Sequence, residues 1–165
     1  MKKILLISDT HNNQKLLRNV VSSVKNITHI FHLGDNCKDL DSNPDLTENI
    51  ILHRVPGIFN PKYFSKIVPS ILSITVENWD FVLAHTVEDL KKSNIIADFY
   101  LFGHTHKPDF YIKNKTNYLN PGHLKNKFDR GFEASYCILK VSKNKLVIKI
   151  FTISGNLYFE KTLKK

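Results

Sequence analysis

The sequence has few cysteines, few glycines and no long hydrophobic run. Its 165 residues include only 2 cysteines and 6 glycines. Cys37 and Cys137 are too few for a disulfide scaffold or a thiolate zinc site, and we expect both to be free thiols. No stretch approaches the roughly 18 continuous apolar residues of a membrane helix. The apolar start of the chain meets Ser8 and Asp9 too early for a signal peptide, which predicts a cytoplasmic protein without a membrane partner.

Acidic residues are scarce relative to basic ones. The chain has 15 Asp and Glu against 24 Lys and Arg, for a formal net charge of +9. Such a charge permits contact with nucleic acid or acidic lipid. The lysines are scattered, however, and become more frequent only toward the C-terminus. There they follow the alternating pattern of a solvated sheet edge. Because no basic stripe is interleaved with aromatic residues, nucleic-acid binding is the least favoured function.

The length and composition fit one globular domain spanning residues 1–165. Hydrophobic residues make up 42% of the chain and charged residues 24%. A domain of this size buries about 68–70% of the surface that its unfolded chain exposes. We therefore expect a hydrophobic core that needs no covalent staple.

The first third of the chain alternates strands with helical segments. Residues 3–8 predict a buried strand, residues 13–26 an amphipathic helix, and residues 29–33 a second strand. A loop or short helix over 36–47 and a third strand over 49–55 follow. Because a strand-helix-strand unit sets its strands parallel and adjacent, their carboxyl ends share one edge of the sheet.

The rest of the chain is rich in strands. Residues 70–77 and 80–85 predict a hairpin that turns at Asn78 and Trp79, and residues 87–94 a short helix. Further strands are expected at 98–102, 109–113, 117–119, 134–142, 145–153 and 157–162. Two stacked sheets with helices outside would bury this many apolar strands, so we expect an α/β fold.

Four short motifs rich in Asp and His follow apolar runs that predict strands. They are Ser8-Asp9-Thr10-His11, Gly34-Asp35, Ala84-His85 and Gly103-His104-Thr105-His106. Open α/β sheets build their sites outside the carboxyl ends of strands. If the chain is extended there, Asp9 and His11 point to one side, and Asp35 is the natural carboxylate to bridge two ions. Imidazole and carboxylate donors suit Mn²⁺, Fe²⁺, Ni²⁺ or Zn²⁺.

Glycine is concentrated beside these motifs. Four of the six glycines stand within or next to the strand-end segments: Gly34, Gly57, Gly103 and Gly122. A crowded site needs close backbone approach, which glycine permits. Turn formation explains each glycine singly, but it does not explain their shared neighbourhood.

The motif order resembles the calcineurin-like metallophosphoesterases. Asp-x-His, Gly-Asp, a lone His and Gly-His-x-His are followed by Asn120-Pro121-Gly122 and Arg130-Gly131, so the resemblance covers most of the chain. The small phosphodiesterases of the YfcE type, to which the retromer subunit Vps29 is related, are the most similar group. The resemblance implies a four-layer α/β/β/α sandwich and a homodimer as the default assembly.

The resemblance also implies a dinuclear metal site, with Mn²⁺ the first choice of ion. One ion would be held by Asp9, His11, Asp35 and His106. The other would be held by Asp35, His85, His104 and an asparagine. The implied reaction is divalent-metal-dependent hydrolysis of a small phosphodiester, in which a metal-bridging hydroxide attacks phosphorus.

The third motif departs from the family pattern. Ile58 stands where the family has the asparagine ligand, and an isoleucine cannot bind a metal. Asn60 reaches the site only if the loop bulges, and Pro56 and Pro61 restrict that loop. We therefore expect a tight first metal site and a weaker second one. The departure also supports an alternative function, a non-catalytic or weakly active metal-binding scaffold for protein interaction.

The roles of several other residues stay open at this point. His123 is either a proton donor to the leaving alkoxide or a solvent-exposed loop histidine. Arg130 either meets a substrate phosphate or pairs with a nearby carboxylate such as Asp129. Asn12 either positions a phosphate or caps the first helix. Trp79 is interpreted as an aromatic residue beside a turn.

Overall fold

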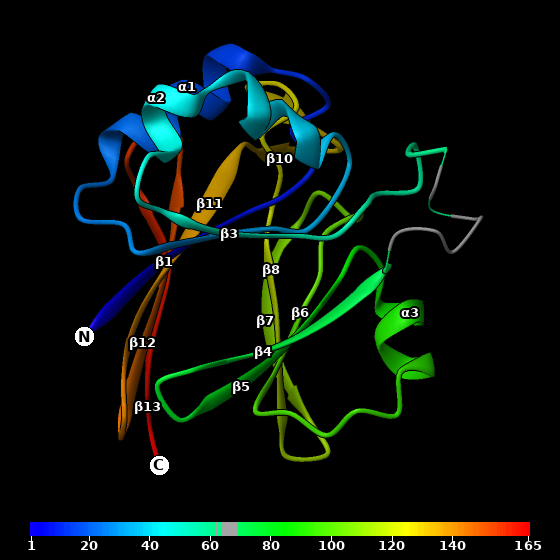
Figure 1. The fold of residues 1–165 in the computed structure, drawn as a ribbon, viewed down its shortest axis with the longest axis vertical. Helices are drawn as coiled ribbons and strands as arrows, with labels where there is room; N and C mark the ends of the chain where they lie inside the picture. The colour runs from blue at the N-terminus through cyan, green and yellow to red at the C-terminus, as the bar shows by residue number, and fades with distance from the viewer. Residues whose placement is uncertain (62, 64–68) are drawn as a thin grey trace.

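The computed structural model describes residues 1–61, 63 and 69–165, and in it the strands form two mixed sheets and a short hairpin (Figure 1). The first sheet has the order β13 (Leu157–Lys164), β12 (Lys145–Thr152), β11 (Ser135–Ser142), β1 (Lys2–Ile7), β2 (His29–His32) and β3 (Ile51–Arg54). The second has the order β4 (Ile71–Val76), β5 (Trp79–Ala84), β6 (Phe99–Leu101), β8 (Thr116–Pro121) and β7 (Pro108–Lys113). The hairpin pairs β9 (Phe128–Asp129) with β10 (Phe132–Glu133).

Helices cover the outer faces of both sheets. The helical segments are α1 (Gln14–Ser23), the 3-10 helix η1 (Cys37–Ser42), α2 (Pro44–Thr47) and α3 (Val87–Lys92). Leu17, Val20 and Val21 of α1 pack with Leu5 and Ile7 of β1 on the outside of the first sheet. Leu90 of α3 packs against β5 on the outside of the second sheet. The predicted α/β fold with four α/β/β/α layers is therefore confirmed.

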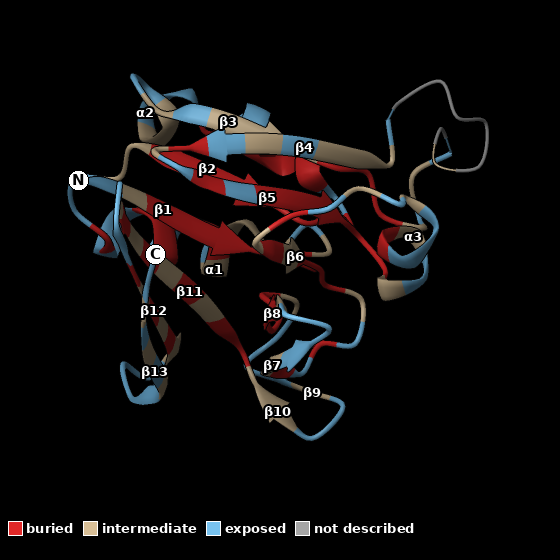
Figure 2. Cartoon of the chain, turned by 90° about the horizontal axis from the view of Figure 1, so that it is seen from below, coloured by how far each residue is buried: buried red, intermediate tan, exposed pale blue. Residues whose placement is uncertain are grey.

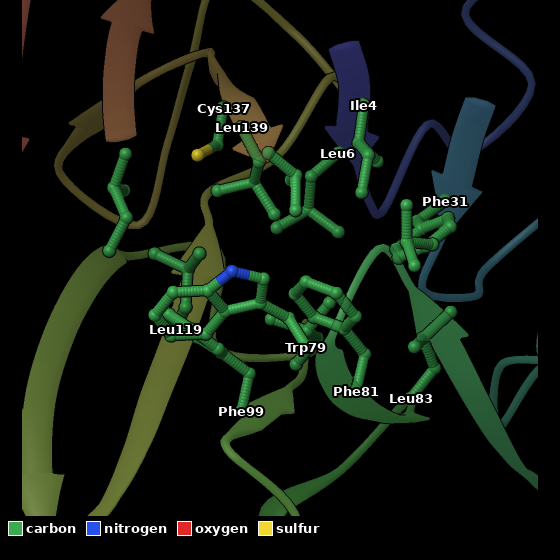
Figure 3. Close-up of a cluster of buried hydrophobic side chains, with 14 of the residues drawn as sticks. Ile4, Leu6, Phe31, Trp79, Phe81, Leu83, Phe99, Leu119, Cys137 and Leu139 are labelled. Atoms are coloured by element: carbon green, nitrogen blue, oxygen red, sulfur yellow. The ribbon is translucent and has the colours of Figure 1, made fainter. Parts of the chain in front are cut away.

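The main core lies between the two sheets. In Figure 3, Trp79, Phe81 and Phe99 of the second sheet face Leu6 and Leu139 of the first. Figure 2 shows that the buried residues concentrate along the central strands β1, β2 and β5. Apolar side chains on the facing sides of the two sheets therefore pack against each other, as the two-sheet prediction requires.

Each sheet contains three neighbouring parallel strands. In the first sheet β1 pairs with β2 and β2 with β3 in parallel, and in the second β5 pairs with β6 and β6 with β8. Parallel strands end at a common edge, so each sheet presents a row of strand ends. The four Asp- and His-rich motifs follow strands of these two sets.

Some element boundaries differ from the predictions. The hairpin of β4 and β5 turns at Glu77 and Asn78, so Trp79 lies beside the turn, as the first residue of β5 opposite Val76, and not within it. The physical reason is burial: Trp79 is 3% exposed in the main core, and its indole N–H donates to the carbonyl of Ser142 at 2.9 Å.

The first helix is shorter than predicted, and its cap is not Asn12. The cap of α1 is Asn13, whose side chain accepts a hydrogen bond from the backbone N–H of Leu16. The hairpin of β9 and β10 has no counterpart among the predicted strands. Within the described residues, no helix has the length and apolarity needed to cross a membrane.

Candidate metal centre

Both sheets deliver their Asp- and His-rich motifs to one place. Asp9 and His11 follow β1, and Asp35 follows β2, all in the first sheet. His85 follows β5, and the histidines of residues 103–106 follow β6 in the second sheet. The backbone N–H of Gly103 donates to the carbonyl of His85 at 3.0 Å, and that of Asp9 to Gly34 at 3.0 Å, which ties the strand ends together.

Two overlapping groups of side chains have the spacing of metal ligands. Asp9, His11 and His106 form one group and Asp9, Asp35 and His85 the other, each with ligand atoms within 4.8 Å of one another. Asp9 Oδ1 lies 3.2 Å from His106 Nε2. Asp35 Oδ2 lies 3.5 Å from His11 Nε2 and 3.4 Å from His85 Nε2, between the two groups. Both carboxylates therefore face both groups.

The centre of the cluster contains buried polar atoms that find no hydrogen-bond partner within the described part of the chain. These atoms are Asp9 Oδ1, His11 Nε2 and His85 Nε2. The other oxygen of Asp9 is satisfied, because it accepts hydrogen bonds from Ser8 Oγ at 2.5 Å and from the backbone N–H of His104 at 2.9 Å. Leaving buried polar atoms unpaired costs about 1–3 kcal/mol each. A bound divalent cation would remove that cost, so these residues fit the metal that the family motifs imply.

Hydrogen bonds away from the cluster decide which imidazole nitrogen faces it. His85 Nδ1 lies 2.7 Å from the carbonyl oxygen of Leu33, and His106 Nδ1 lies 2.5 Å from Asp129 Oδ2. Both partners can only accept, so each Nδ1 carries a proton, and in the neutral imidazole Nε2 then keeps its lone pair. That is the tautomer in which Nε2 can bind a metal.

The electrostatics favour the metal-binding protonation states of Asp9, His11 and His104, whereas they shift His85 toward its protonated form. Burial by itself would raise the pKa of Asp9, but the neighbouring His106 and His85 outweigh it and hold that pKa below its usual value. Burial lowers the pKa of His11 and of His104. Burial by itself would also lower the pKa of His85, but the nearby carboxylates of Asp35 and Asp9 raise it. A carboxylate and neutral imidazoles are the forms that bind cations.

The backbone at the site is not extended, contrary to the expectation for Asp-x-His. Five of the Asp and His residues in the motifs have positive φ: Asp9 (52°), His11 (44°), Asp35 (51°), His104 (65°) and His106 (63°). The cause is that the segment after β1 folds around the end of β2, where the N–H of His11 reaches the carbonyl of Asp35 at 3.4 Å. Such conformations cost about 1–3 kcal/mol each and cluster at functional sites.

Three of the glycines that the sequence places beside the motifs are in close contact with candidate ligands. No side chain would fit at these three positions. A Cβ on Gly34 would lie 2.5 Å from His85 Nδ1, and one on Gly103 would lie 2.5 Å from Asp9 Oδ2. A Cβ on Gly57 would lie 1.8 Å from Asp35 Oδ1 and 2.1 Å from its backbone nitrogen. The close approach inferred from the sequence is therefore a property of the fold.

His104 lies beside the two ligand groups of Asp and His residues without belonging to either, and Asn60 lines a neighbouring cavity. The ring of His104 contacts that of His85, with centroids 5.2 Å apart. Asn60 lines a cavity of about 340 Å³ together with Asn12 and Phe59, and the Phe59 ring lies edge-on to His11 at 5.6 Å. Ile58, at the position of the expected asparagine, is partly exposed.

His123 is buried, which corrects the expectation of an exposed loop histidine. Its side chain has 0% exposure, and its ring lies 5.2 Å from that of His106. Nε2 contacts the carbonyl of Phe132 at 3.2 Å, and Nδ1 accepts from the backbone N–H of Lys125 at 3.3 Å. Burial lowers the pKa of His123. Its use as a proton donor stays a prediction, and these contacts favour a positioning role.

Arg130 takes the pairing that the sequence left open. Its guanidinium donates to the carbonyl oxygen of His104 at 2.7 Å, and its Nε lies 3.7 Å from Asp129. Its side chain is still 52% exposed, so contact with a phosphate also remains a prediction. Asp129, the partner of His106, was not among the predicted site residues. The pattern Phe-Asp-Arg-Gly-Phe-Glu over 128–133, a hairpin signature with a central glycine, is the signal that predicts its position.

Comparison with protein families supplies the deciding observation. Residues 1–144 match the family described as the calcineurin-like phosphoesterase superfamily domain. The chain belongs to this superfamily. No curated protein sequence matches this phosphoesterase-superfamily chain.

Solved structures share the superfamily fold over almost the whole chain. Vacuolar protein sorting 29 from Cryptosporidium parvum is 18% identical, with 99% of this chain and 98% of that chain covered and a TM-score of 0.77. Wild-type Vps29 from Entamoeba histolytica, complexed with Zn²⁺, is 19% identical over 98% of both chains, with a TM-score of 0.70. The phosphoesterase YfcE from E. coli is 15% identical over 96% of this chain and 98% of that chain, with a TM-score of 0.70.

Proposed function

We propose that the chain is a divalent-metal-dependent phosphodiesterase. The observation that carries the proposal is the set of buried polar atoms on Asp9, His11 and His85 that have no hydrogen-bond partner among the described residues. A protein that used this region only as a structural surface gains nothing from unpaired polar atoms that face one another. A hydrolase that binds cations there gains a site in which every one of these atoms is satisfied.

The ligand roles follow from the positions of the side chains. His11 and His106, with Asp9, are proposed to hold the first ion, and His85 and His104 the second. Asp35 is the proposed bridge, because its Oδ2 lies between His11 and His85. Divalent ions bound there would polarise a phosphoryl oxygen and lower the pKa of a coordinated water. Mn²⁺ is the proposed ion, and the Zn²⁺ complex of the Vps29 from Entamoeba histolytica suggests a second ion to test.

The second site is proposed to be the weaker one. Its expected asparagine is replaced by Ile58, which has no donor atom. Asn60, on the wall of the adjacent cavity, is the proposed substitute ligand. Equilibrium dialysis against increasing Mn²⁺ should resolve one tight and one weak ion per chain. Asn60→Ala should weaken only the second ion, and two equally tight ions would contradict this part of the proposal.

Hydrolysis of a chromogenic phosphodiester, bis(p-nitrophenyl) phosphate, tests the function. Activity should require added Mn²⁺ and disappear with a chelator. Asp35→Asn should lower kcat/KM by at least about 100-fold, since loss of even an outer-shell partner costs about 10–100-fold. The matched control is Asp45→Asn, which removes an exposed carboxylate paired with Arg18 at 2.9 Å and should leave the rate unchanged.

The alternative function is an inactive or weakly active metal-binding scaffold that recognises another protein. Ile58 favours it, as does the similarity to Vps29 structures in fold. Under this alternative the chain binds Mn²⁺ but does not hydrolyse the phosphodiester in its presence. Any residual hydrolysis would be the same in the wild type and in Asp35→Asn. Metal binding without turnover would therefore select the scaffold.

A further inference from the structure

We infer that Asp129 is a positioning residue that fixes the tautomer and orientation of His106, with the hairpin of β9 and β10 as its support. The inference goes deeper into the proposed function and rests on it for its metal-binding part. Neither the motif pattern nor the ligand groups include Asp129.

The geometry joins Asp129 to the cluster through one imidazole. Asp129 Oδ2 lies 2.5 Å from His106 Nδ1, and on the other side of the ring Nε2 lies 3.2 Å from Asp9 Oδ1. A carboxylate that accepts from Nδ1 forces the proton onto that nitrogen and frees the Nε2 lone pair. Without this acceptor, the proton would move to Nε2 of His106, because Asp9 Oδ1 would then be the nearest acceptor. Nε2 would lose the lone pair that it needs to bind a metal.

The hairpin holds the segment 103–106 at more than one point. Arg130 donates to the carbonyl oxygen of His104 at 2.7 Å, next to Asp129 in the chain. The carbonyl of Phe132 contacts His123, whose ring lies tilted against that of His106 with centroids 5.2 Å apart. The turn between the two strands has φ of 50° at Arg130 and 84° at Gly131, the signs of a tight hairpin turn. Three residues of this hairpin, Asp129, Arg130 and Phe132, thus support His104 and His106 directly or through His123.

A cation pairs with the second oxygen of Asp129. Lys125 Nζ lies 3.1 Å from Asp129 Oδ1, the oxygen that does not contact His106. The two carboxylate oxygens therefore have different partners. Lys125→Met removes this ion pair without touching the bond to Nδ1, and it is the matched control for the inference.

His85 provides a reference within the same molecule. Its Nδ1 proton goes to the backbone carbonyl of Leu33, a partner that no side-chain substitution removes. Changes at Asp129 should therefore alter His106 and leave His85 unchanged. A general loss of folding would alter both.

The test reads the proton position directly. In metal-free ¹⁵N-labelled protein above neutral pH, long-range ¹H–¹⁵N correlation spectra should show a protonated Nδ1 and an unprotonated Nε2 for His106. The His106 signals are assigned as those lost in His106→Gln. Asp129→Ala should abolish this pattern for His106 alone, whereas Lys125→Met keeps it. A wild-type His106 protonated on Nε2 would overturn the inference without any variant.

Metal binding supplies the second readout. Asp129→Ala should weaken binding of the first Mn²⁺ by about 10–100-fold, the usual effect of losing the partner of a histidine ligand. Lys125→Met should change it by no more than a few-fold. Equal Mn²⁺ affinity of wild type and Asp129→Ala would overturn the inference. If the wild type binds no Mn²⁺ at all while His106 shows the expected tautomer, the proposed function fails and the positioning of His106 by Asp129 stands.

Discussion

A methyl group at Gly57 would test whether the site depends on close approach of two backbone segments. A Cβ there would lie 2.1 Å from the backbone nitrogen of Asp35 and 2.6 Å from its Cα, in addition to 1.8 Å from Oδ1. Rotation of the carboxylate can relieve the contact with Oδ1. It cannot relieve the two backbone contacts, so the segment of Asp35 or the loop of Gly57 must move.

The size of that movement follows from the contact distances. Ordinary contacts of a Cβ begin at 3.4 Å. A Cβ that would lie 2.1 Å from the nitrogen of Asp35 therefore forces the two segments to move apart by about 1.3 Å. Overpacking of this kind costs about 1–3 kcal/mol. For a chain of this size that lowers Tm by about 2–12 °C, at about 2–4 °C per kcal/mol. A misplacement of about 1 Å can also cost about 100-fold in rate.

Gly57→Ala should therefore remain folded while losing much of its function. Thermal unfolding measures the first effect, and Mn²⁺ titration with bis(p-nitrophenyl) phosphate hydrolysis measures the second. Gly155→Ala is the control, since its Cβ would meet nothing within 4 Å, although its φ of 89° makes it strained. Gly155→Ala should lose stability only. Full Mn²⁺ affinity and rate in Gly57→Ala would refute the reasoning.

Two further predictions concern stability away from the cluster. Trp79→Ala should lower the free energy of unfolding by about 3–5 kcal/mol. Trp79→Phe should lower it by about 1–3 kcal/mol, because it removes the hydrogen bond to the Ser142 carbonyl. Urea unfolding measures both. Burial lowers the pKa of His29 and of His53, so the unfolded chain binds more protons and stability falls as pH drops below about 6.5. The double variant His29→Gln/His53→Gln should flatten this decline in thermal melts taken across that range, and an unchanged slope would contradict the assignment.

Much of the fold was predictable because its signals are local. The apolar run before Asp9 is continuous, as a buried parallel strand requires, and gives β1, and the shorter run before Asp35, interrupted by His32, gives β2. The order of the motifs along the chain then predicted that their side chains meet at strand ends. The cluster of Asp9, Asp35 and His85 agrees with that prediction.

The parts that could not be predicted depend on contacts between distant segments. The positive φ of Asp9 and His11 arises from hydrogen bonds to residues 34 and 35, which no local propensity reports. The hairpin turn lies one residue earlier than predicted, at Glu77 and Asn78, because Trp79 is buried in the core as the first residue of β5. The role of Asp129 requires the fold to bring it to His106, 23 residues earlier in the chain.

The candidate ligands come from both sheets, so the core between the sheets helps to set the distances between them. Asp9 and Asp35 move with the first sheet, and His85 and His106 with the second, so the distance between the sheets sets the distance between carboxylates and imidazoles. That spacing depends on side chains far from the ligands, such as Phe31 and Phe81, whose rings meet across the core at 5.7 Å. Substitutions that make these core side chains smaller or larger would change the spacing of the sheets and therefore the metal affinity. An ion bound at the edge would in turn clamp the two halves of the sandwich together.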